Sequence, residues 1–190
     1  MSGFDQLAPV AQVERIRRLA RAALERWDLD ATALDLIKYR ENAVFAVTTA
    51  GQDRVVLRVH RAGYHDDDEL RSEYEWMAAL DAAGIRTPPV LPARDGRLFH
   101  VVGAAGVPEP RQVDVLGWVE GRQLGTVEHG IEGDAASLVR VHRTLGELAA
   151  RVHVQATAWR RPPGFRRHAI AGLCLGIAGC IISLAVVAMM

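Results

Sequence analysis

The chain has 190 residues, of which 49% are hydrophobic, a size and composition that suit one domain or one domain with an appendage. This content of apolar residues excludes a disordered protein. Because 23 basic residues balance 23 acidic ones, no overall positive field favours nucleic acid, and we expect no nucleic-acid partner.

The first predicted element is a helix from Val13 to Trp27, where apolar residues recur at helical spacing with arginines between them. A short strand follows at Leu34 to Ile37. Two β-rich runs, Ala43 to Thr48 and Arg54 to His60, then predict a hairpin around the turn Ala50-Gly51-Gln52-Asp53. These runs indicate the start of an antiparallel sheet.

A second helix is predicted from Asp67 to Ala83, with acidic residues at its start and Gly84 as its stop signal. Beyond it, Leu98 to Val102 and Gln112 to Val119 predict another hairpin, joined by a segment rich in glycine and proline. The sheet would therefore be interrupted by one helix.

The second half of the chain begins with a glycine-rich segment, Gly121 to Gly133, which we predict to be a loop. Ser137 to Trp159 is then predicted as a long helix with its apolar residues along one side. That side needs the tail, another chain or a membrane to cover it, so self-association is expected.

The C-terminal tail differs from everything before it, because the 22 residues from Ala169 to Met190 carry no charge. At about 1.5 Å per residue a helix of this length crosses a bilayer core of about 30 Å. One interpretation is an anchor that holds a cytoplasmic domain at the inner face of a membrane. The other is sequence that replaces a missing lobe after a truncation or frame change. Both cysteines, Cys174 and Cys180, lie in this tail, so the rest of the chain suits a reducing cytoplasm.

A cation on a strand followed by an acid on the next helix can fix positive charge against phosphate oxygens. Arg58 lies in the second β-rich run, and Glu73 lies near the start of the predicted helix. The guanidinium has a forked set of donors that suits phosphate, and Glu73 would hold that fork in place. Spacing alone favours a surface arginine with an ordinary helix acid nearby, since such pairs are common. A Gly-Lys-Ser/Thr phosphate loop is excluded, because Ile37 precedes Lys38, the single lysine.

The segments around these two residues form an ordered series. The series is Arg40 to Val47, Val55 to Arg61, Ser72 to Trp76, Gly84 to Pro88 and Leu116 to Gly121. In this order the segments resemble the N-terminal lobe of the aminoglycoside phosphotransferase and choline kinase-like family. The resemblance implies an α+β fold: a kinase-like N-lobe with a five-stranded antiparallel sheet and one packed helix, a hinge, the first helix of a second lobe, and an apolar C-terminal helix.

The resemblance also implies a division of the chain. Residues 1–33 would hold the N-terminal helix, 34–121 the nucleotide-binding lobe and hinge, 122–168 the linker and the start of the second lobe, and 169–190 the apolar tail.

Site residues follow from the resemblance position by position. Arg58 matches the residue that contacts the α- and β-phosphates, Glu73 matches the helix acid that pairs with it, and Asn42 lies in the loop over the phosphates. The backbone of Trp118-Val119-Glu120 would meet the adenine edge. The resemblance implies ATP as the nucleotide and a hydroxyl on a small molecule as the acceptor.

The catalytic loop of that family has no match in the sequence. Such a loop needs a His-Gly-Asp motif, a later asparagine and an aspartate for magnesium, yet Asn42 is the one asparagine and Asp134 the one aspartate after the hinge. His129-Gly130 with Gly133-Asp134 imitates the motif, and we predict it to be part of the loop.

We therefore predict the nucleotide-binding portion of an ATP-dependent small-molecule phosphotransferase, truncated before its catalytic loop and inactive alone. Magnesium would bind only if a catalytic lobe is supplied, and we predict no metal site in the chain itself. The alternative is a membrane-anchored, non-catalytic module that binds a nucleotide or a protein.

Overall fold

The structure is a computed structural model that describes residues 3–121, 125–126, 130–131, 133–160 and 162–164. The chain divides into two compact units. The first consists of Met1–Asp66 and Pro89–Trp118, and the second of Asp67–Pro88 and Val119–Met190.

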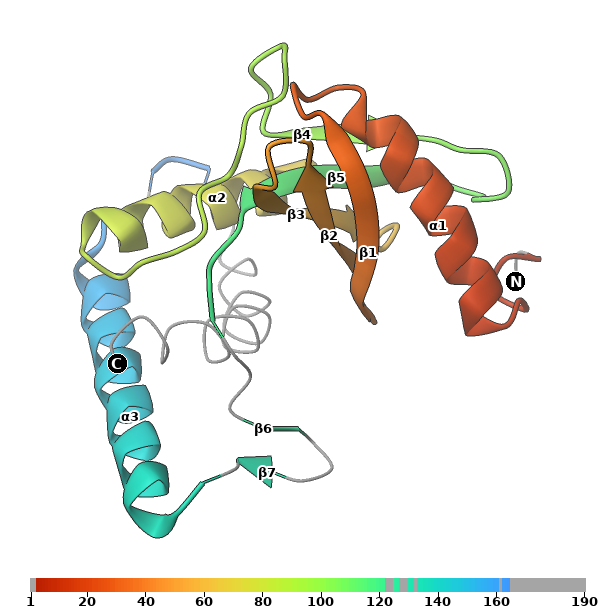
Figure 1. The fold of residues 1–190 in the computed structure, drawn as a ribbon. Coiled ribbons are helices and arrows are strands. Elements are labelled where there is room, and N and C mark those ends of the chain that lie inside the picture. Colours follow the sequence, from red (N-terminus) through yellow and green to blue (C-terminus); the bar gives the residue numbers. More distant parts are fainter. Residues whose placement is uncertain (1–2, 122–124, 127–129, 132, 161, 165–190) are drawn as a thin grey trace. The chain divides into compact units, whose positions relative to one another are not determined.

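The first unit is a five-stranded sheet with the helix α1 (Pro9–Leu24) against one face (Figure 1). All neighbouring strands are antiparallel, so the predicted five-stranded antiparallel sheet and both of its hairpins are confirmed. In spatial order the strands are β1 (Ala31–Tyr39), β2 (Asn42–Thr49), β3 (Arg54–His60), β5 (Arg111–Gly117) and β4 (Phe99–Val102).

The core of this unit lies between α1 and the sheet. Successive side chains of a strand point to opposite faces, and the apolar positions of β2, β3 and β5 alternate so that one face carries only core residues. The fully buried members include Leu19, Ala20, Ala23, Phe45, Val47, Leu57, Val113 and Val115.

The bounds of α1 and β1 differ from prediction for physical reasons. α1 begins at Pro9 rather than Val13, since a proline suits the first turn of a helix, where its missing N–H is not needed. Trp27 lies beyond the helix end but is buried, and its Nε1 donates a hydrogen bond to the Leu91 oxygen at 2.9 Å. β1 is longer than predicted because backbone pairing with β2, from Ala31–Thr49 to Tyr39–Ala43, defines it, while most of its side chains are exposed.

The second unit contains α2 (Asp67–Ala82) and α3 (Ala135–Ala158). α2 stops where Gly84 adopts a φ of 74°. The Gly84 nitrogen donates to the Asp81 oxygen and the Ile85 nitrogen donates to the Leu80 oxygen, each at 2.9 Å. This pair of bonds is a Schellman motif, so the stop signal predicted at Gly84 is confirmed.

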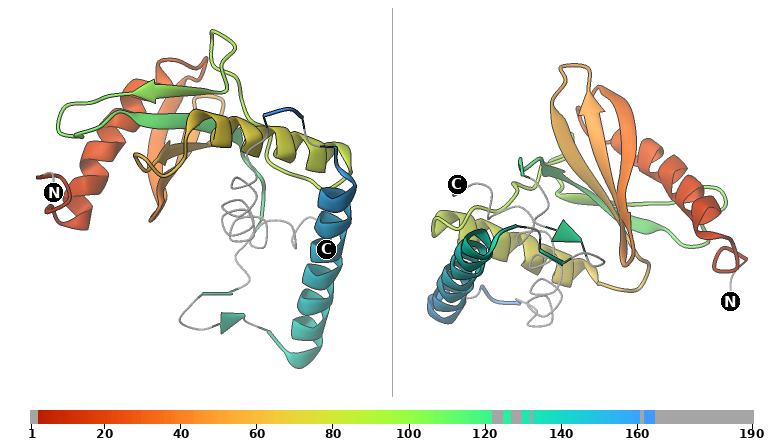
Figure 2. Two further views of the ribbon diagram at one scale, coloured as in Figure 1. Left: turned by 180° about the vertical axis from the view of Figure 1, so that it is seen from behind. Right: turned by 60° about the horizontal axis from the view of Figure 1, so that its bottom comes forward.

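One apolar side of α3 packs on α2 within the chain (Figure 2). Trp76, Leu80 and Ile85 are buried there, and Trp76 Nε1 donates to Gln155 Oε1 at 3.0 Å. The partners from α3 and its C-terminal end are Leu148, Val152, Ala156 and Trp159. The prediction that this side needs the tail, another chain or a membrane was therefore wrong for the C-terminal half of α3, because the end of α2 covers it.

The glycine-rich segment predicted as a loop contains two short paired strands, β6 (Gly125–Thr126) and β7 (Gly130–Ile131). The prediction was wrong for these strands, because a two-residue ribbon depends on backbone pairing and leaves no apolar run in the sequence. The predicted apolar helix over 169–190 lies outside the described residues. Within the described ranges, no helix combines the length and the apolar character needed to cross a bilayer.

Candidate functional site

The face of the sheet opposite the core is organised in rows across β2, β3 and β5. Because the strands are in antiparallel register, residues paired across neighbouring strands share a face. From one end of the face to the other, the rows are Asn42 with His60, Val44 with Arg58 and Asp114, Ala46 with Val56 and Leu116, and Thr48 with Arg54. The charged side chains are concentrated toward one end, beside Asn42.

Arg58 is held by a carboxylate on the neighbouring strand. Its Nε donates to Asp114 Oδ1 at 2.9 Å and its Nη2 donates to Asp114 Oδ2 at 2.6 Å. This is the forked, two-bond geometry for which a guanidinium is suited. The Asp114 side chain is completely buried, whereas 14% of the Arg58 side chain is exposed. The pair therefore presents its positive member, and not its negative one, at the surface of the face.

His60 contacts the same carboxylate, with its Nε2 at 3.1 Å from Asp114 Oδ2. Burial by itself would raise the pKa of Asp114, but the charges of Arg58 and His60 and the hydrogen bonds from both side chains hold that pKa well below its usual value. Because an ionised carboxylate only accepts hydrogen bonds, the His60 Nε2 carries the proton of this contact.

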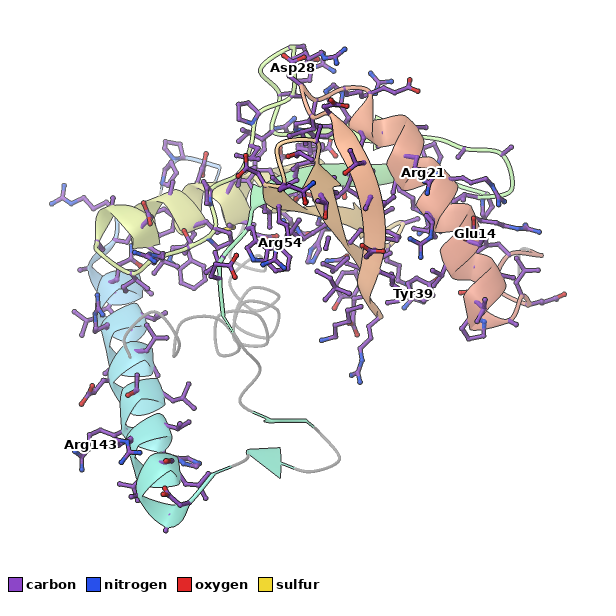
Figure 3. The ribbon with its side chains drawn as sticks, in the orientation of Figure 1. Glu14, Arg21, Asp28, Tyr39, Arg54 and Arg143 are labelled. Carbon is purple, nitrogen blue, oxygen red and sulfur yellow. The ribbon has the colours of Figure 1, made fainter. Side chains whose placement is uncertain are left out.

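Apolar side chains form the middle of the face. Val44, Ala46 and Val56 are partly buried, in contrast to the fully buried residues of the opposite face. At the far end, the Arg54 guanidinium lies over the Trp118 ring, with its carbon 4.1 Å from the ring centroid. Figure 3 labels Arg54 at the start of β3, beside the end of β5. The face thus runs from the end with Arg58, here called the cationic end, through an apolar floor to the end with Trp118, here called the aromatic end, where the Arg54 guanidinium also lies.

Several polar atoms on this face are buried without a hydrogen-bonding partner among the described residues. They are Asn42 Oδ1, His60 Nδ1 and Trp118 Nε1. Buried polar atoms in folded proteins usually have a partner, from protein, water or ligand. Such atoms at both ends of one face indicate a surface prepared for additional hydrogen bonds.

The structure brings together part of the predicted site. Asn42, Arg58 and Trp118 belong to the first unit and share the face described above. Glu73, Val119 and Glu120 belong to the second unit, where Glu73 is buried in α2 and Glu120 is exposed. The expected pairing of Glu73 with Arg58 joins the two units and stays a prediction.

Asp114 is a residue that the sequence analysis missed. Its signal was present, because an aspartate within the apolar run Val113-Asp114-Val115-Leu116 is an unusual occupant of a strand. A buried carboxylate in such a run needs a cation beside it. The pairing itself depends on which strands are neighbours, and Asp114 is 56 positions away from Arg58 along the chain.

The apparent His-Gly-Asp imitation has a structural explanation at its last residue. Asp134 precedes α3, and its Oδ1 accepts a hydrogen bond from the Ser137 nitrogen at 2.7 Å, which makes it the helix N-cap. Across the residues that the structure describes, no three histidine, cysteine, aspartate or glutamate side chains gather as metal ligands.

The comparison with family models identifies the chain. The model for APH, the Phosphotransferase enzyme family, matches residues 33–175, about three quarters of the sequence. The chain belongs to this family. The resemblance drawn from the five sequence segments is therefore confirmed.

Individual relatives agree with the family assignment. An uncharacterized protein of Deinococcus radiodurans is 31% identical over 156 residues, which cover 82% of this chain and 40% of that protein. The structure of a microcompartment-associated aminopropanol kinase is 34% identical with a TM-score of 0.64, covering 80% of this chain and 44% of that one.

A further solved structure extends the likeness in fold. An amicoumacin kinase in complex with AMP-PNP, Ca²⁺ and Ami has a TM-score of 0.60 at 14% identity, covering 84% of this chain and 44% of that one. At this identity the likeness concerns the fold alone. The chain spans less than half the length of each of these three proteins.

Proposed function

We propose that this chain provides the nucleotide-binding part of an ATP-dependent phosphotransferase whose acceptor is a hydroxyl on a small molecule. Arg58 contacts the phosphates, and Asn42 lies beside them. The adenine ring lies at the other end of the face, on the floor made by Ala46 and Val56, next to Trp118.

One observation carries this proposal: a partly exposed guanidinium stands at one end of an apolar sheet face and an indole stands at the other. Arg58 and Arg54 are four residues apart in β3, which at about 3.3 Å per residue separates the Arg58 row from the Trp118 end by about 13 Å. A ligand with an anionic end and a flat aromatic end fits such a face.

The unpartnered buried atoms support the same orientation. Asn42 Oδ1 and His60 Nδ1 are at the cationic end, and Trp118 Nε1 is at the aromatic end. Trp118 Nε1 is a donor, and a ring nitrogen of adenine is an acceptor for it. Asn42 Oδ1 only accepts, so at the cationic end ordered water bridges it to the phosphate oxygens, which are acceptors as well. The family membership, together with a relative that is an aminopropanol kinase at 34% identity, supports a small-molecule hydroxyl as the acceptor.

These residues bind and orient the nucleotide, and they are assigned no part in proton transfer. Phosphoryl transfer also requires a group that accepts the hydroxyl proton and ligands for a metal ion. The sequence has one asparagine, Asn42, and Asp134 is engaged as a helix cap. We assign no residue of this chain as a magnesium ligand. We expect the chain by itself to bind ATP without transferring its phosphate.

Titration calorimetry of the chain with ATP and with adenosine tests the proposal. Arg58→Ala removes charge-assisted hydrogen bonds, each worth about 1.5–3 kcal/mol, so ATP affinity falls about ten- to a hundredfold while adenosine affinity changes little. The matched control is Arg94→Ala, which removes another arginine that pairs with an aspartate, Asp28, at an exposed position. It leaves both affinities unchanged. A wild-type chain that binds neither ligand contradicts the proposal.

A further inference from the structure

We propose that Asp114 is a positioning residue that holds the Arg58 guanidinium in the orientation that receives the phosphates. This inference rests on the proposed function and deepens it. It assigns a role in nucleotide affinity to a side chain that is itself buried and does not reach the ligand.

The register of two neighbouring strands fixes the geometry of the ion pair. Arg58 and Asp114 are directly opposite each other in the β3–β5 register, within a sheet whose other face is a fully buried core. Two hydrogen bonds, at 2.9 and 2.6 Å, fix both the position and the plane of the guanidinium. A side chain with four rotatable bonds is thereby restricted before the nucleotide arrives, which is preorganisation.

A second side chain restricts the Asp114 carboxylate itself. His60, two residues after Arg58 on the same strand face, contacts Asp114 Oδ2 at 3.1 Å and restricts the carboxylate from the side of the next row. Asp114 has no exposed surface, so its influence on a ligand passes through Arg58. The three side chains form one connected group on two neighbouring strands.

The two parallel hydrogen bonds require an arginine at position 58. An ammonium group is a point charge on a flexible stem and cannot make two parallel bonds to one carboxylate in a fixed plane. With Asp114 in place, Arg58→Lys keeps the charge but loses the fork, so positioning is lost although the net charge of the face is unchanged.

A purely repulsive effect of Asp114 on phosphate predicts the opposite result. If its negative charge merely reduced the attraction between Arg58 and the phosphates, removing that charge would strengthen ATP binding. The burial of Asp114 and the exposure of Arg58 oppose this account, because the positive member of the pair is nearer to the ligand. The sign of the change in affinity therefore separates the two effects.

The test measures dissociation constants for ATP and adenosine by titration calorimetry with the full chain. For Asp114→Asn we expect ATP to bind about tenfold more weakly, the size of one charge-assisted hydrogen bond, with adenosine affinity unchanged within about twofold. Arg58→Lys has a similar effect. The double variant binds ATP about as weakly as the more affected of the two single variants, because both substitutions remove the same arrangement.

The control for simple destabilisation is Val113→Ala, one residue earlier on β5 but on the core face, where Val113 is fully buried. It lowers the melting temperature and leaves the ratio of ATP to adenosine affinity at its wild-type value. If Asp114→Asn does not fold, Asp114→Glu replaces it. The longer acid keeps the negative charge but displaces the Arg58 guanidinium, so the ratio of ATP to adenosine affinity falls.

The results distinguish failure of this inference from failure of the proposed function. If the ratio depends on Arg58 but is unchanged or raised in the Asp114 variants, the positioning role is overturned and nucleotide binding stands. If Arg58→Ala also leaves the ratio unchanged, both are overturned.

Discussion

Gly117 ends β5 immediately before Trp118, at a place where the chain leaves no room for a side chain. A Cβ atom built on Gly117 would lie 2.7 Å from Pro89 Cγ and 2.9 Å from Pro89 Cδ. The same two residues are joined by the bond from the Gly117 nitrogen to the Pro89 oxygen, at 2.7 Å. Since the proline ring is rigid and its backbone is held, the clash in Gly117→Ala must move β5 or the segment beside it.

The magnitude follows from two opposing terms. Overpacking of this kind costs about 1–3 kcal/mol, while replacing glycine by alanine stiffens the unfolded chain and returns about 0.4–1 kcal/mol. Gly117 is not among the glycines of positive φ, so its cost is steric and includes no penalty for a left-handed backbone. We expect Gly117→Ala to lower the free energy of unfolding by about 1–2 kcal/mol.

The assay is urea unfolding followed by tryptophan fluorescence, to which all four tryptophans contribute, among them Trp27 in the core of the same unit. Gly103→Ala is the matched control, because a Cβ there meets nothing within 4 Å and the substitution should be neutral or slightly stabilising. Pro89→Ala removes the ring atoms Cγ and Cδ. Adding Gly117→Ala to Pro89→Ala should therefore cost much less unfolding free energy than Gly117→Ala costs in the wild-type chain.

The steric explanation is refuted if Gly117→Ala changes the free energy of unfolding no more than Gly103→Ala does. It is equally refuted if Pro89→Ala gives no recovery, because the cost would then arise elsewhere.

Two further predictions concern polar contacts. The depressed pKa of Asp114 contributes stability that is present above the unfolded pKa of about 4 and is lost as pH falls toward the folded pKa. The free energy of unfolding, measured by urea titration from pH 7 to pH 2, should therefore fall less steeply in acid for Asp114→Asn than for wild type. Equal slopes would contradict this prediction. In the second unit, Gln155→Ala should cost about 1–3 kcal/mol of unfolding free energy, because it leaves the buried Trp76 N–H without its acceptor. Val154→Ala, at a side chain that is 67% exposed, serves as the control. Similar urea midpoints for the two variants would refute the prediction.

Much of the fold could be predicted from local patterns. The alternation in Arg54 to His60 places Leu57 in the core and Arg58 on the other face, as β3 has them. The stop signal at Gly84 works through backbone geometry that is local to the end of α2. These features depend on residues close in sequence, so periodicity and turn chemistry reveal them.

Features that depend on pairing between segments far apart in the chain were harder to predict from the sequence. β1 is long because of its register with β2, although its own side chains are mostly exposed, and β6 and β7 are too short to show any pattern. The apolar side of α3 had an internal partner at the end of α2, and no periodicity in α3 names that partner.

For the candidate site, the sequence by itself determined the family and named Asn42, Arg58 and Trp118 as candidate nucleotide-binding residues. Only the tertiary structure decided that Asp114 accepts both hydrogen bonds of the Arg58 fork, and that Arg54 lies over Trp118. The physical reason is that an ion pair or a ring contact requires a few ångströms between side chains. Sheet order brings β3 and β5 to that distance, and sequence spacing does not specify sheet order.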